Sequence, residues 1–428
     1  MIVTPRAATA ASGGGVPNGS AFVGERPPAA PVGGLPVRIL QRRLTVIWTL
    51  LFFNVLTPRP GSPSIIDISK PVGQLLTTGC LVAALVLAMG LNRRMAIRPN
   101  LVLGLTTILA ALALMTSVRG LVGMGSLIRC GRLFGFLAVL WLLTPWWGRR
   151  DMLLARAHFR AVLFVCGTVL LGLVVAPGTA LSGGEQHRLV GVVWAIPAPQ
   201  VAEYAALAAG MAAALWAAGR MRFRAAAALF GLGVAMILAS KTRTALVALV
   251  VAVAFVAISM FCSKRRVRRA VAIVLVAAPL AVVVIAPLAA DWFRRDQSEA
   301  DIGSLTGRRK VWNALLDTPR PEFNRWFGFG LSDKSFGGLS VDSTWLTVYQ
   351  DEGLVGVALV GATVVAVIAA AVLYPPGPQR AVALFLVAYG TAAAYTEVGL
   401  GDASPYLLSL VAAASLVMPR AVICRASG

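Results

Sequence analysis

Two short basic segments stand out in a chain that is otherwise mostly apolar. Ser-Lys-Thr-Arg-Thr-Ala carries Lys241 and Arg243, and Gly-Arg-Arg-Lys-Val-Trp carries Arg308 and Arg309. A guanidinium group is permanently charged and can donate two parallel hydrogen bonds to phosphate oxygens. The segments therefore predict a site for a phosphorylated anion. The alternative for any single Lys or Arg is a long side chain that snorkels from a helix end to the membrane surface.

The segment that begins at Gly307 also predicts the start of an amphipathic helix. Arg308 and Arg309 then lie near its N-terminus, where positive charge opposes the helix dipole. An anion held by the backbone amides and the guanidinium groups together removes this conflict.

A polar pair, Asp342-Ser343, opens the apolar stretch that follows. A carboxylate can accept the proton of an attacking hydroxyl group, so Asp342 is a candidate general base and Ser343 a candidate substrate contact. Asp-Ser-Thr is also a good helix N-cap sequence, and Asp342 could serve as a cap while another group, Asp351 or Glu352, acts as the base.

Three further arginines are candidates for substrate binding. Arg129 and Arg132 are spaced i, i+3 inside an apolar stretch, hence on one helical face, where an arginine usually lines a pocket or pairs with an acid. They predict a contact with an anionic headgroup, unless this helix is partly interfacial or Glu203 neutralises one of them. Arg188 is either a phosphate contact or an ordinary juxtamembrane arginine.

The sequence offers little for metal or nucleotide chemistry. His158 and His187 are the two histidines, and the Cys/His spacings of metal sites do not occur. Neither a glycine-rich phosphate loop with its lysine nor an Asp-x-Asp pair is found. We expect no cofactor, no metal and no nucleotide-activated donor.

The rest of the chain must hold these groups at a bilayer. Of its 428 residues, 58% are hydrophobic and 13% are charged, too few polar groups to cover a water-soluble globule. Apolar stretches near the roughly 20 residues that cross a bilayer recur, and in lipid they must be helical. The sequence predicts an all-α polytopic membrane protein with about twelve spans, at 38–56, 71–91, 101–116, 120–143, 157–176, 196–217, 224–240, 243–262, 268–289, 343–374, 379–397 and 404–419.

The predicted domain organisation is a tail followed by one membrane domain. Residues 1–36 are rich in Pro, Gly and Ala and predict a disordered cytoplasmic tail. Residues 37–428 form the membrane domain, with one long extracytoplasmic loop, 290–342, between the ninth and tenth spans.

Orientation follows from the basic residues. Most of the 39 lysines and arginines fall in the tail and in alternate short loops. Because basic flanks resist translocation, this side is predicted to be cytoplasmic, with both termini. The net charge of +22 then reflects topology and attraction to anionic lipid headgroups, and does not indicate nucleic-acid binding.

Four motifs together resemble the O-antigen ligase and polymerase superfamily. They are Ser240 to Ala245, Gly307 to Trp312, Phe327-Gly-Phe-Gly330, and Asp342-Ser343 leading to Glu-Gly-Leu-Val-Gly at Gly356. The resemblance implies transfer or polymerisation, without metal, of glycans carried on a polyprenyl diphosphate, at the outer face of the bacterial cytoplasmic membrane. By position, Arg243 and Arg308 match the arginines thought to hold the diphosphate. Asp342-Ser343 stands where the family has His-Asn.

These observations favour an inverting glycosyltransferase of the surface-polysaccharide polymerase or ligase type. Its partners would be the lipid-linked donor, a glycan or lipid-glycan acceptor, the bilayer and envelope-assembly proteins. Polymerase and ligase share the donor chemistry, so the sequence leaves that choice open. The alternatives are a transporter or flippase of lipid-linked glycans, and a non-catalytic scaffold for envelope assembly.

Overall fold

The computed structural model describes residues 36–56, 64–65, 69–120, 123–149, 151–182, 187–277, 292 and 308–418. The tail predicted for 1–36 lies outside these residues apart from Pro36, as does most of the first half of the predicted loop 290–342. The domain boundaries therefore stay predictions.

The described chain is almost entirely helical, with one two-stranded hairpin. In chain order its elements are α1 (Val37–Val55), α2 (Lys70–Leu91), α3 (Leu101–Arg119), α4 (Met124–Leu142), η1 (Thr144–Trp146), α5 (Leu153–Val175), α6 (Pro177–Ala180), α7 (Ala198–Ala217), α8 (Phe223–Ser240), α9 (Arg243–Phe261), α12 (Arg308–Asp317), α13 (Glu322–Phe327), β1 (Ser335–Phe336), β2 (Leu339–Ser340), α14 (Thr344–Leu373), α15 (Pro378–Ala393) and α16 (Pro405–Val417). Residues 265–277 are also helical.

Seven helices in the described part of the chain are long and apolar enough to cross a membrane: α2, α3, α4, α5, α8, α9 and α14. The protein is an all-α, polytopic membrane protein, as the composition predicts. Helix α16 is apolar but shorter, while α1, α7 and α15 are outside the seven. The predicted count of twelve spans is not settled by these helices and stays a prediction.

Several helix starts follow from local sequence. The Asn100 side chain accepts from the backbone N–H groups of Val102 and Leu103 at the start of α3, and Ser404 accepts from Leu407 N–H in α16. Both satisfy amides that have no partner within their helix. Helices α7, α15 and α16 also have proline in their first turn, where the missing N–H costs nothing.

Helix α7 is buried along most of its length because small side chains let its neighbours approach. A Cβ atom at Gly210 would lie 1.9 Å from the Phe385 ring of α15, and one at Gly233 of α8 would lie 2.7 Å from the Ala205 carbonyl oxygen of α7. Close approach through small residues is the usual basis of helix packing in membranes. The core of the bundle is therefore built around α7.

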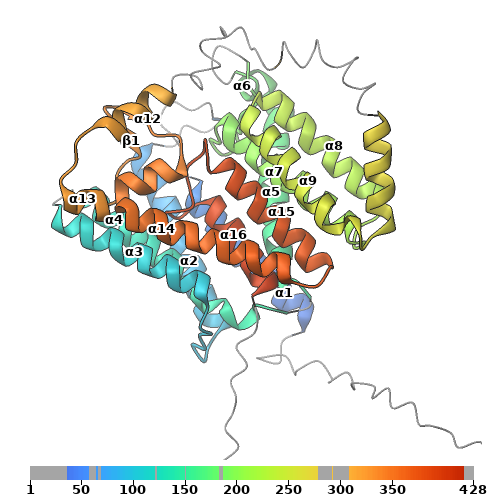
Figure 1. Cartoon of the computed structure of the whole chain (residues 1–428), viewed down its shortest axis with the longest axis horizontal. Helices are drawn as coiled ribbons and strands as arrows, with labels where there is room; N and C mark the ends of the chain where they lie inside the picture. Colours follow the sequence, from blue (N-terminus) through green and yellow to red (C-terminus); the bar gives the residue numbers. More distant parts are fainter. Residues whose placement is uncertain are drawn as a thin grey trace, which may run out of the picture. The chain divides into compact units, whose positions relative to one another are not determined.

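Segments that the sequence places on one side of the membrane contact one another. Asn92, after α2, donates to the Leu142 carbonyl at the end of α4 over 2.9 Å, and Arg266 donates to the Trp216 carbonyl of α7 over 3.2 Å. At the opposite helix ends, Leu331 N–H donates to Ser117 Oγ of α3 over 3.1 Å. The α12, α13 and β1 region lies beside the ends of α3, α4 and α14 (Figure 1).

Two glycine motifs interlock where this region meets α14. Gly353 interrupts α14 with φ +67°, and a Cβ there would lie 2.4 Å from the Trp326 backbone. In return, a Cβ at Gly328 would lie 2.2 Å from the Asp351 carbonyl oxygen. Because both positions have positive φ and direct backbone contact, only glycine fits. The Phe-Gly-Phe-Gly segment is thereby fixed against the kink in α14.

Candidate active site

Arg308 and Asp342 form an ion pair in which Arg308 Nε lies 3.1 Å from Asp342 Oδ2. Arg308 is the first residue of α12, and Asp342 lies two residues before α14. The Ser340 hydroxyl donates to the other carboxylate oxygen over 2.6 Å. The two side chains are 26% and 38% exposed, so the pair is open to solvent on one side. The predicted arginine and the predicted carboxylate are thus brought together.

Asp342 is not the N-cap of α14 in this structure. The N-cap residue is Ser343, and no side-chain capping bond is made there. The first amide of the helix, Thr344 N–H, is instead satisfied by the carbonyls of Ala394 and Glu397, at 3.0 and 2.9 Å. The capping interpretation of Asp342 therefore has no support in this geometry, and its carboxylate faces Arg308.

Arg188 holds the turn that carries Lys241 and Arg243. Its Nε donates to the Ser240 carbonyl over 2.9 Å, and its second terminal nitrogen donates to Thr242 Oγ1 over 3.2 Å. The backbone adds a bond of 3.0 Å from Leu189 N–H to the Ala239 carbonyl. Arg188 thus donates from one edge of its guanidinium to the 240–242 turn, and these bonds fix the position of that turn.

Arg188 also lies within electrostatic reach of the Arg308 pair. Burial lowers the pKa of Arg188; the Glu397 carboxylate counteracts this, and the Arg308 guanidinium adds to the lowering. Charges act on one another in this way only over short distances, because solvent and salt screen longer ones. Arg188 and Glu397 therefore belong to the same cluster as Arg308.

The loop between α15 and α16 connects the two basic segments. Thr396 hydrogen-bonds Thr244, the second residue of α9, over 2.9 Å, and the Glu397 carbonyl accepts from the Thr344 hydroxyl over 2.7 Å. The Tyr395 ring packs edge-on against Trp312 of α12, with centroids 5.5 Å apart. We call Arg188, Arg243, Arg308, Asp342 and Glu397 the Arg308 cluster.

The other residues predicted near this cluster differ in exposure. Lys241 is half-buried at the C-cap of α8 in a left-handed conformation, φ +51°, and Arg309 is exposed on α12. Ser343 is 3% exposed. A buried N-cap residue such as Ser343 is poorly placed to touch a substrate, whereas the Lys241 and Arg309 side chains are more accessible.

Arg129 and Arg132 lie at a second charged group. Helix α4 begins at Met124 and has 19 residues, so Arg132 lies next to its middle residue, Leu133, and Arg129 lies nearer its start. Arg132 donates to Asn54 over 3.3 Å, and its charge acts on Asp402. The nearby acid is thus Asp402, and the ion pairs of the described residues do not join either arginine to Glu203.

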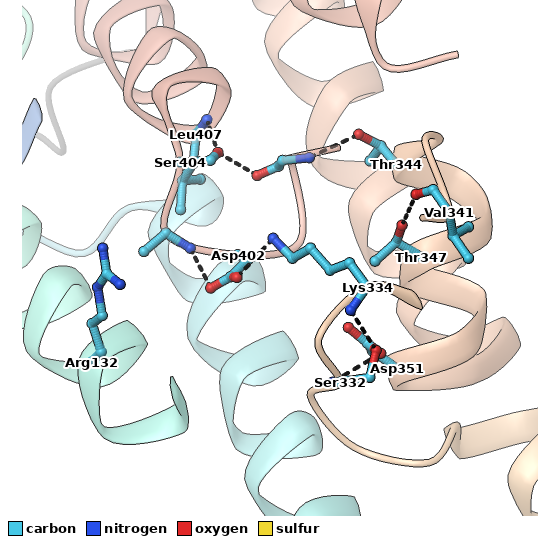
Figure 2. A network of polar contacts seen from close by, with 12 residues as sticks. Arg132, Ser332, Lys334, Val341, Thr344, Thr347, Asp351, Asp402, Ser404 and Leu407 are labelled. Carbon is cyan, nitrogen blue, oxygen red and sulfur yellow. Dashed lines mark hydrogen bonds and ion pairs between the residues drawn. The ribbon is translucent and has the colours of Figure 1, made fainter. Parts of the chain in front are cut away.

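Asp402 is the centre of this second group (Figure 2). Lys334 Nζ lies 2.9 Å from Asp402 Oδ2, and Ala403 N–H donates to Oδ1 over 2.6 Å. Burial acts to raise the pKa of Asp402, but Lys334, the Ala403 amide and Arg132 together hold it below its usual value. Close by, Asp351 Oδ1 accepts from Ser332 N–H over 3.2 Å.

Residue type and spacing in the sequence did not single out Lys334, Glu397 or Asp402 as site residues. The two acidic residues could have been noticed because acidic residues are scarce in this sequence. The chain has 17 of them, and two fall in the short segment between α15 and α16. An acidic residue that close to a membrane interior is costly unless it has a partner. The packing of segments that are far apart in the sequence decides which basic residue pairs with which acidic residue.

Comparison with known families addresses the same part of the chain. Residues 226–361 match the family model described as O-antigen ligase. This segment of the chain is an O-antigen ligase domain. No curated protein sequence matches the chain.

The O-antigen ligase domain runs from α8 to the middle of α14 and contains Arg243, Arg308 and Asp342. Arg188 and the 395–402 segment lie outside the match and complete the cluster from the flanking chain. The domain and the apolar helices indicate a multi-pass bacterial membrane protein of the glycan ligase or polymerase type, which would use a lipid-linked glycan donor and a glycan acceptor.

Proposed function

We propose that the protein transfers a glycan, with inversion and without a metal, from a polyprenyl diphosphate to an acceptor hydroxyl at the outer face of the cytoplasmic membrane. The observation that carries the proposal is the Arg308 to Asp342 ion pair inside the O-antigen ligase domain, with Arg188 and the Arg243 turn beside it. Both chain termini are then cytoplasmic.

In this proposal the arginines stabilise the leaving group. The acceptor oxygen forms a bond to the anomeric carbon, and the bond from that carbon to the diphosphate oxygen breaks with its electron pair. Negative charge grows on the diphosphate, where Arg243 and Arg308 donate hydrogen bonds. Loss of one preorganised donor of this kind typically costs about 10²–10³ in rate.

Asp342 takes the proton of the acceptor hydroxyl in the same step. In the structure its two oxygens accept from Arg308 and Ser340. When a diphosphate binds, Arg308 donates hydrogen bonds to the phosphate oxygens in place of Asp342. The Asp342 carboxylate is then free to accept the proton of the acceptor hydroxyl group. A positioned base of this type contributes about 10²–10⁴ in rate.

The test is transfer by purified protein in nanodiscs, with a polyprenyl-diphosphate glycan as donor and a glycan acceptor. Arg243→Ala and Arg308→Ala should abolish transfer in correctly inserted protein. Arg325→Ala, an exposed arginine of α13, is the matched control and should remain active. Wild-type rates in both cluster variants would refute the proposal.

Deletion of the gene separates polymerase from ligase. Loss of a polymerase leaves single repeat units on the cell surface, while loss of a ligase leaves polymer on its lipid carrier. Unchanged surface glycan in the deletion strain would count against both activities.

A further inference from the structure

Two arginines of helix α4, Arg129 and Arg132, leave most of their hydrogen-bond donors unused. Both residues are half-buried, and Arg132 donates from Nε alone, to Asn54 Oδ1 over 3.3 Å. Within the described part of the chain, its terminal nitrogens and the whole guanidinium group of Arg129 form no hydrogen bond or ion pair. These nitrogens are not sealed inside the protein either. The two guanidinium groups can therefore donate to a ligand.

Asp402 is the acid that faces Arg132, and it already has a closer partner. Lys334 Nζ lies 2.9 Å from Asp402 Oδ2, and Lys334 and Arg132 lie on two sides of the carboxylate (Figure 2). Arg132 acts on Asp402 through its charge, without a direct ion pair between them. One carboxylate beside two cations leaves a positive charge that an anion can balance.

Asp333 is the acid on which Arg129 acts, and its carboxylate is also occupied. It accepts from the Ser335 hydroxyl over 2.6 Å. That bond is the main cause, and the Arg129 charge a smaller one, of a pKa below the usual value for Asp333. Asp333 is exposed, so solvent screens its attraction for Arg129. Asp351 and Glu352 are each 1% exposed, so neither presents its carboxyl group at this surface.

The face of α4 that carries the arginines borders lipid. Met124 and Ile128 are 72% and 65% exposed, and exposed apolar side chains of a membrane helix lie against acyl chains. Ile128 and Arg132 are four residues apart, so they are neighbours on the helix surface. A Cβ atom at Gly131 would meet no atom within 4 Å, so the backbone beside Arg132 is open as well. A ligand can therefore reach these arginines from the bilayer.

The arginines lie in the outer half of the membrane span. The start of α4 is at the predicted outer side, because Ser126 donates to Ser117 Oγ over 2.8 Å and Ser117 accepts from Leu331 N–H. With a rise of about 1.5 Å per residue, Arg129 and Arg132 are about 8 and 12 Å from that start. Long arginine side chains extend from such depths toward the headgroup layer. The expected ligand is a lipid headgroup of the outer leaflet.

Two guanidinium groups together favour one class of headgroup. Each can bind a pair of phosphate oxygens with parallel hydrogen bonds. The phosphodiester of an ordinary phospholipid has fewer unsubstituted oxygens and less negative charge than a lipid monophosphate or diphosphate. The arginine pair is therefore matched best by a monophosphate or diphosphate headgroup.

This arginine pair is separate from the Arg308 cluster and close to it. The pair belongs to α4, whereas the arginines proposed to bind the donor belong to α9 and α12. The 395–402 segment reaches both groups, with Glu397 in the cluster and Asp402 opposite Arg132. A lipid-linked donor and a lipid-linked acceptor each bring their own phosphate group, and one site cannot hold both at once.

We propose that Arg129 and Arg132 bind the monophosphate or diphosphate headgroup of a second lipid, the one that carries the acceptor glycan. The assignment of this lipid to the acceptor rests on the proposed function. The donor diphosphate occupies the Arg308 cluster at the same time, and the acceptor glycan extends from α4 toward Asp342. The acceptor is then a lipid-glycan and not a free glycan.

The first test counts bound lipid phosphates and needs no transfer. Purified protein is mixed with undecaprenyl phosphate, and the bound molecules are counted by native mass spectrometry. The wild type should bind two, one at each arginine group, and the double variant Arg129→Gln/Arg132→Gln should bind one. The matched control Arg156→Gln/Arg160→Gln changes two exposed arginines of α5 on the predicted cytoplasmic side and should bind two.

Competition identifies the source of the phosphate. Inorganic phosphate and phosphatidylglycerol, each at the concentration of undecaprenyl phosphate, should leave both molecules bound. If either competitor displaces the Arg129-dependent molecule, the site takes free phosphate or an ordinary phospholipid, and the proposal is wrong. Two bound molecules in the Arg129→Gln/Arg132→Gln variant, or a single one in the wild type, would also overturn it.

The second test measures transfer in nanodiscs with two acceptors, a lipid-diphosphate glycan and the same glycan released from its lipid. Arg129→Gln/Arg132→Gln should raise the KM of the lipid-linked acceptor about tenfold or more, the usual scale for losing a hydrogen bond between charged groups. The kcat, the KM of the donor and the KM of the released glycan should keep their wild-type values, whereas a general structural defect would change them.

A single variant covers the case in which the double variant fails to insert. Arg129→Gln removes no hydrogen bond or ion pair within the described residues, so it should fold as the wild type does. It should still raise the KM of the lipid-linked acceptor. An unchanged KM in correctly inserted Arg129→Gln and in the double variant would overturn the proposal.

The acceptor site and the proposed function fail separately. If Arg129-dependent lipid binding is found in a protein that transfers no glycan, the lipid site stands and the transfer reaction does not. If transfer is found and both variants keep the wild-type KM for the lipid-linked acceptor, the transfer reaction stands and the acceptor site does not.

Discussion

Arg308 and Asp342 are separated by 34 positions in the chain, and their side chains meet at 3.1 Å. Both are partly exposed, and ion pairs of this kind contribute about 0–1 kcal/mol to stability. The pair is therefore a weak structural element. If removing the pair strongly reduces glycan transfer, the loss reflects a role in the reaction, because the protein should remain folded.

Asp342→Asn tests the base assignment. We expect a transfer rate about 10²–10⁴ lower, because an amide cannot take the hydroxyl proton, with a melting temperature close to the wild type. Rates and thermal unfolding are measured on the same nanodisc sample. Near-normal transfer by Asp342→Asn would remove Asp342 from the mechanism and direct attention to Asp351 and Glu352.

Arg188→Lys tests a positioning role. A lysine keeps the charge but cannot bond Ser240 O and Thr242 Oγ1 from one planar group, so the turn carrying Arg243 should loosen. We expect lower transfer in Arg188→Lys and about the same loss in Arg188→Ala. If the lysine variant keeps full activity while the alanine variant loses it, charge at this position matters and geometry does not.

The Lys334 to Asp402 bridge predicts a pH dependence of stability. The folded pKa of Asp402 is below its usual value, so its contribution is fully present above the unfolded pKa of about 3.9 and is lost as pH falls through the lower folded value. The gap in melting temperature between wild type and Asp402→Asn should be constant from neutral pH to about pH 5 and shrink below pH 4. Asp317→Asn, at the exposed end of α12, is the control. A gap that stays the same down to pH 3 would contradict the assignment.

Two glycines of α14, Gly353 at the kink and Gly361 beyond it, should respond differently to substitution by alanine. Gly353→Ala forces a side chain onto the Trp326 backbone at a positive φ, so we expect loss of folded protein in detergent extracts. Gly361→Ala meets no atom within 4 Å and should be neutral or stabilise by up to about 1 kcal/mol. The measurement is the monodisperse yield on size-exclusion chromatography. Equal yields would show that the kink is not required.

Orientation is tested by labelling single cysteines in a cysteine-free background. Leu339→Cys places a thiol on the exposed hairpin of the predicted outer region, and Cys262 is exposed at the predicted cytoplasmic end of α9. A membrane-impermeant maleimide applied to intact spheroplasts should label Leu339→Cys alone, and both after lysis. Labelling of Cys262 in intact cells would invert the proposed topology.

Much of the fold is local and can be predicted from the sequence. Apolar length and helix-start residues such as Asn100 predict most helices to within a few residues, because a backbone in lipid must bond within its own segment. The predicted start of α4 is several residues early, since the sequence just before Met124 is as apolar as the helix itself. Arg129 is consequently nearer a helix end than the sequence suggested.

The sequence by itself determined that the protein is helical and membrane-embedded, and that arginines of two short segments and one carboxylate are its candidates for chemistry. Residue type and spacing carry that information. Only the tertiary structure decided that Arg308 pairs with Asp342, that Arg188 holds the Arg243 turn, and that Lys334 meets Asp402. Those partners come from helices far apart in the chain, and their contacts depend on how whole helices pack, which no local pattern records.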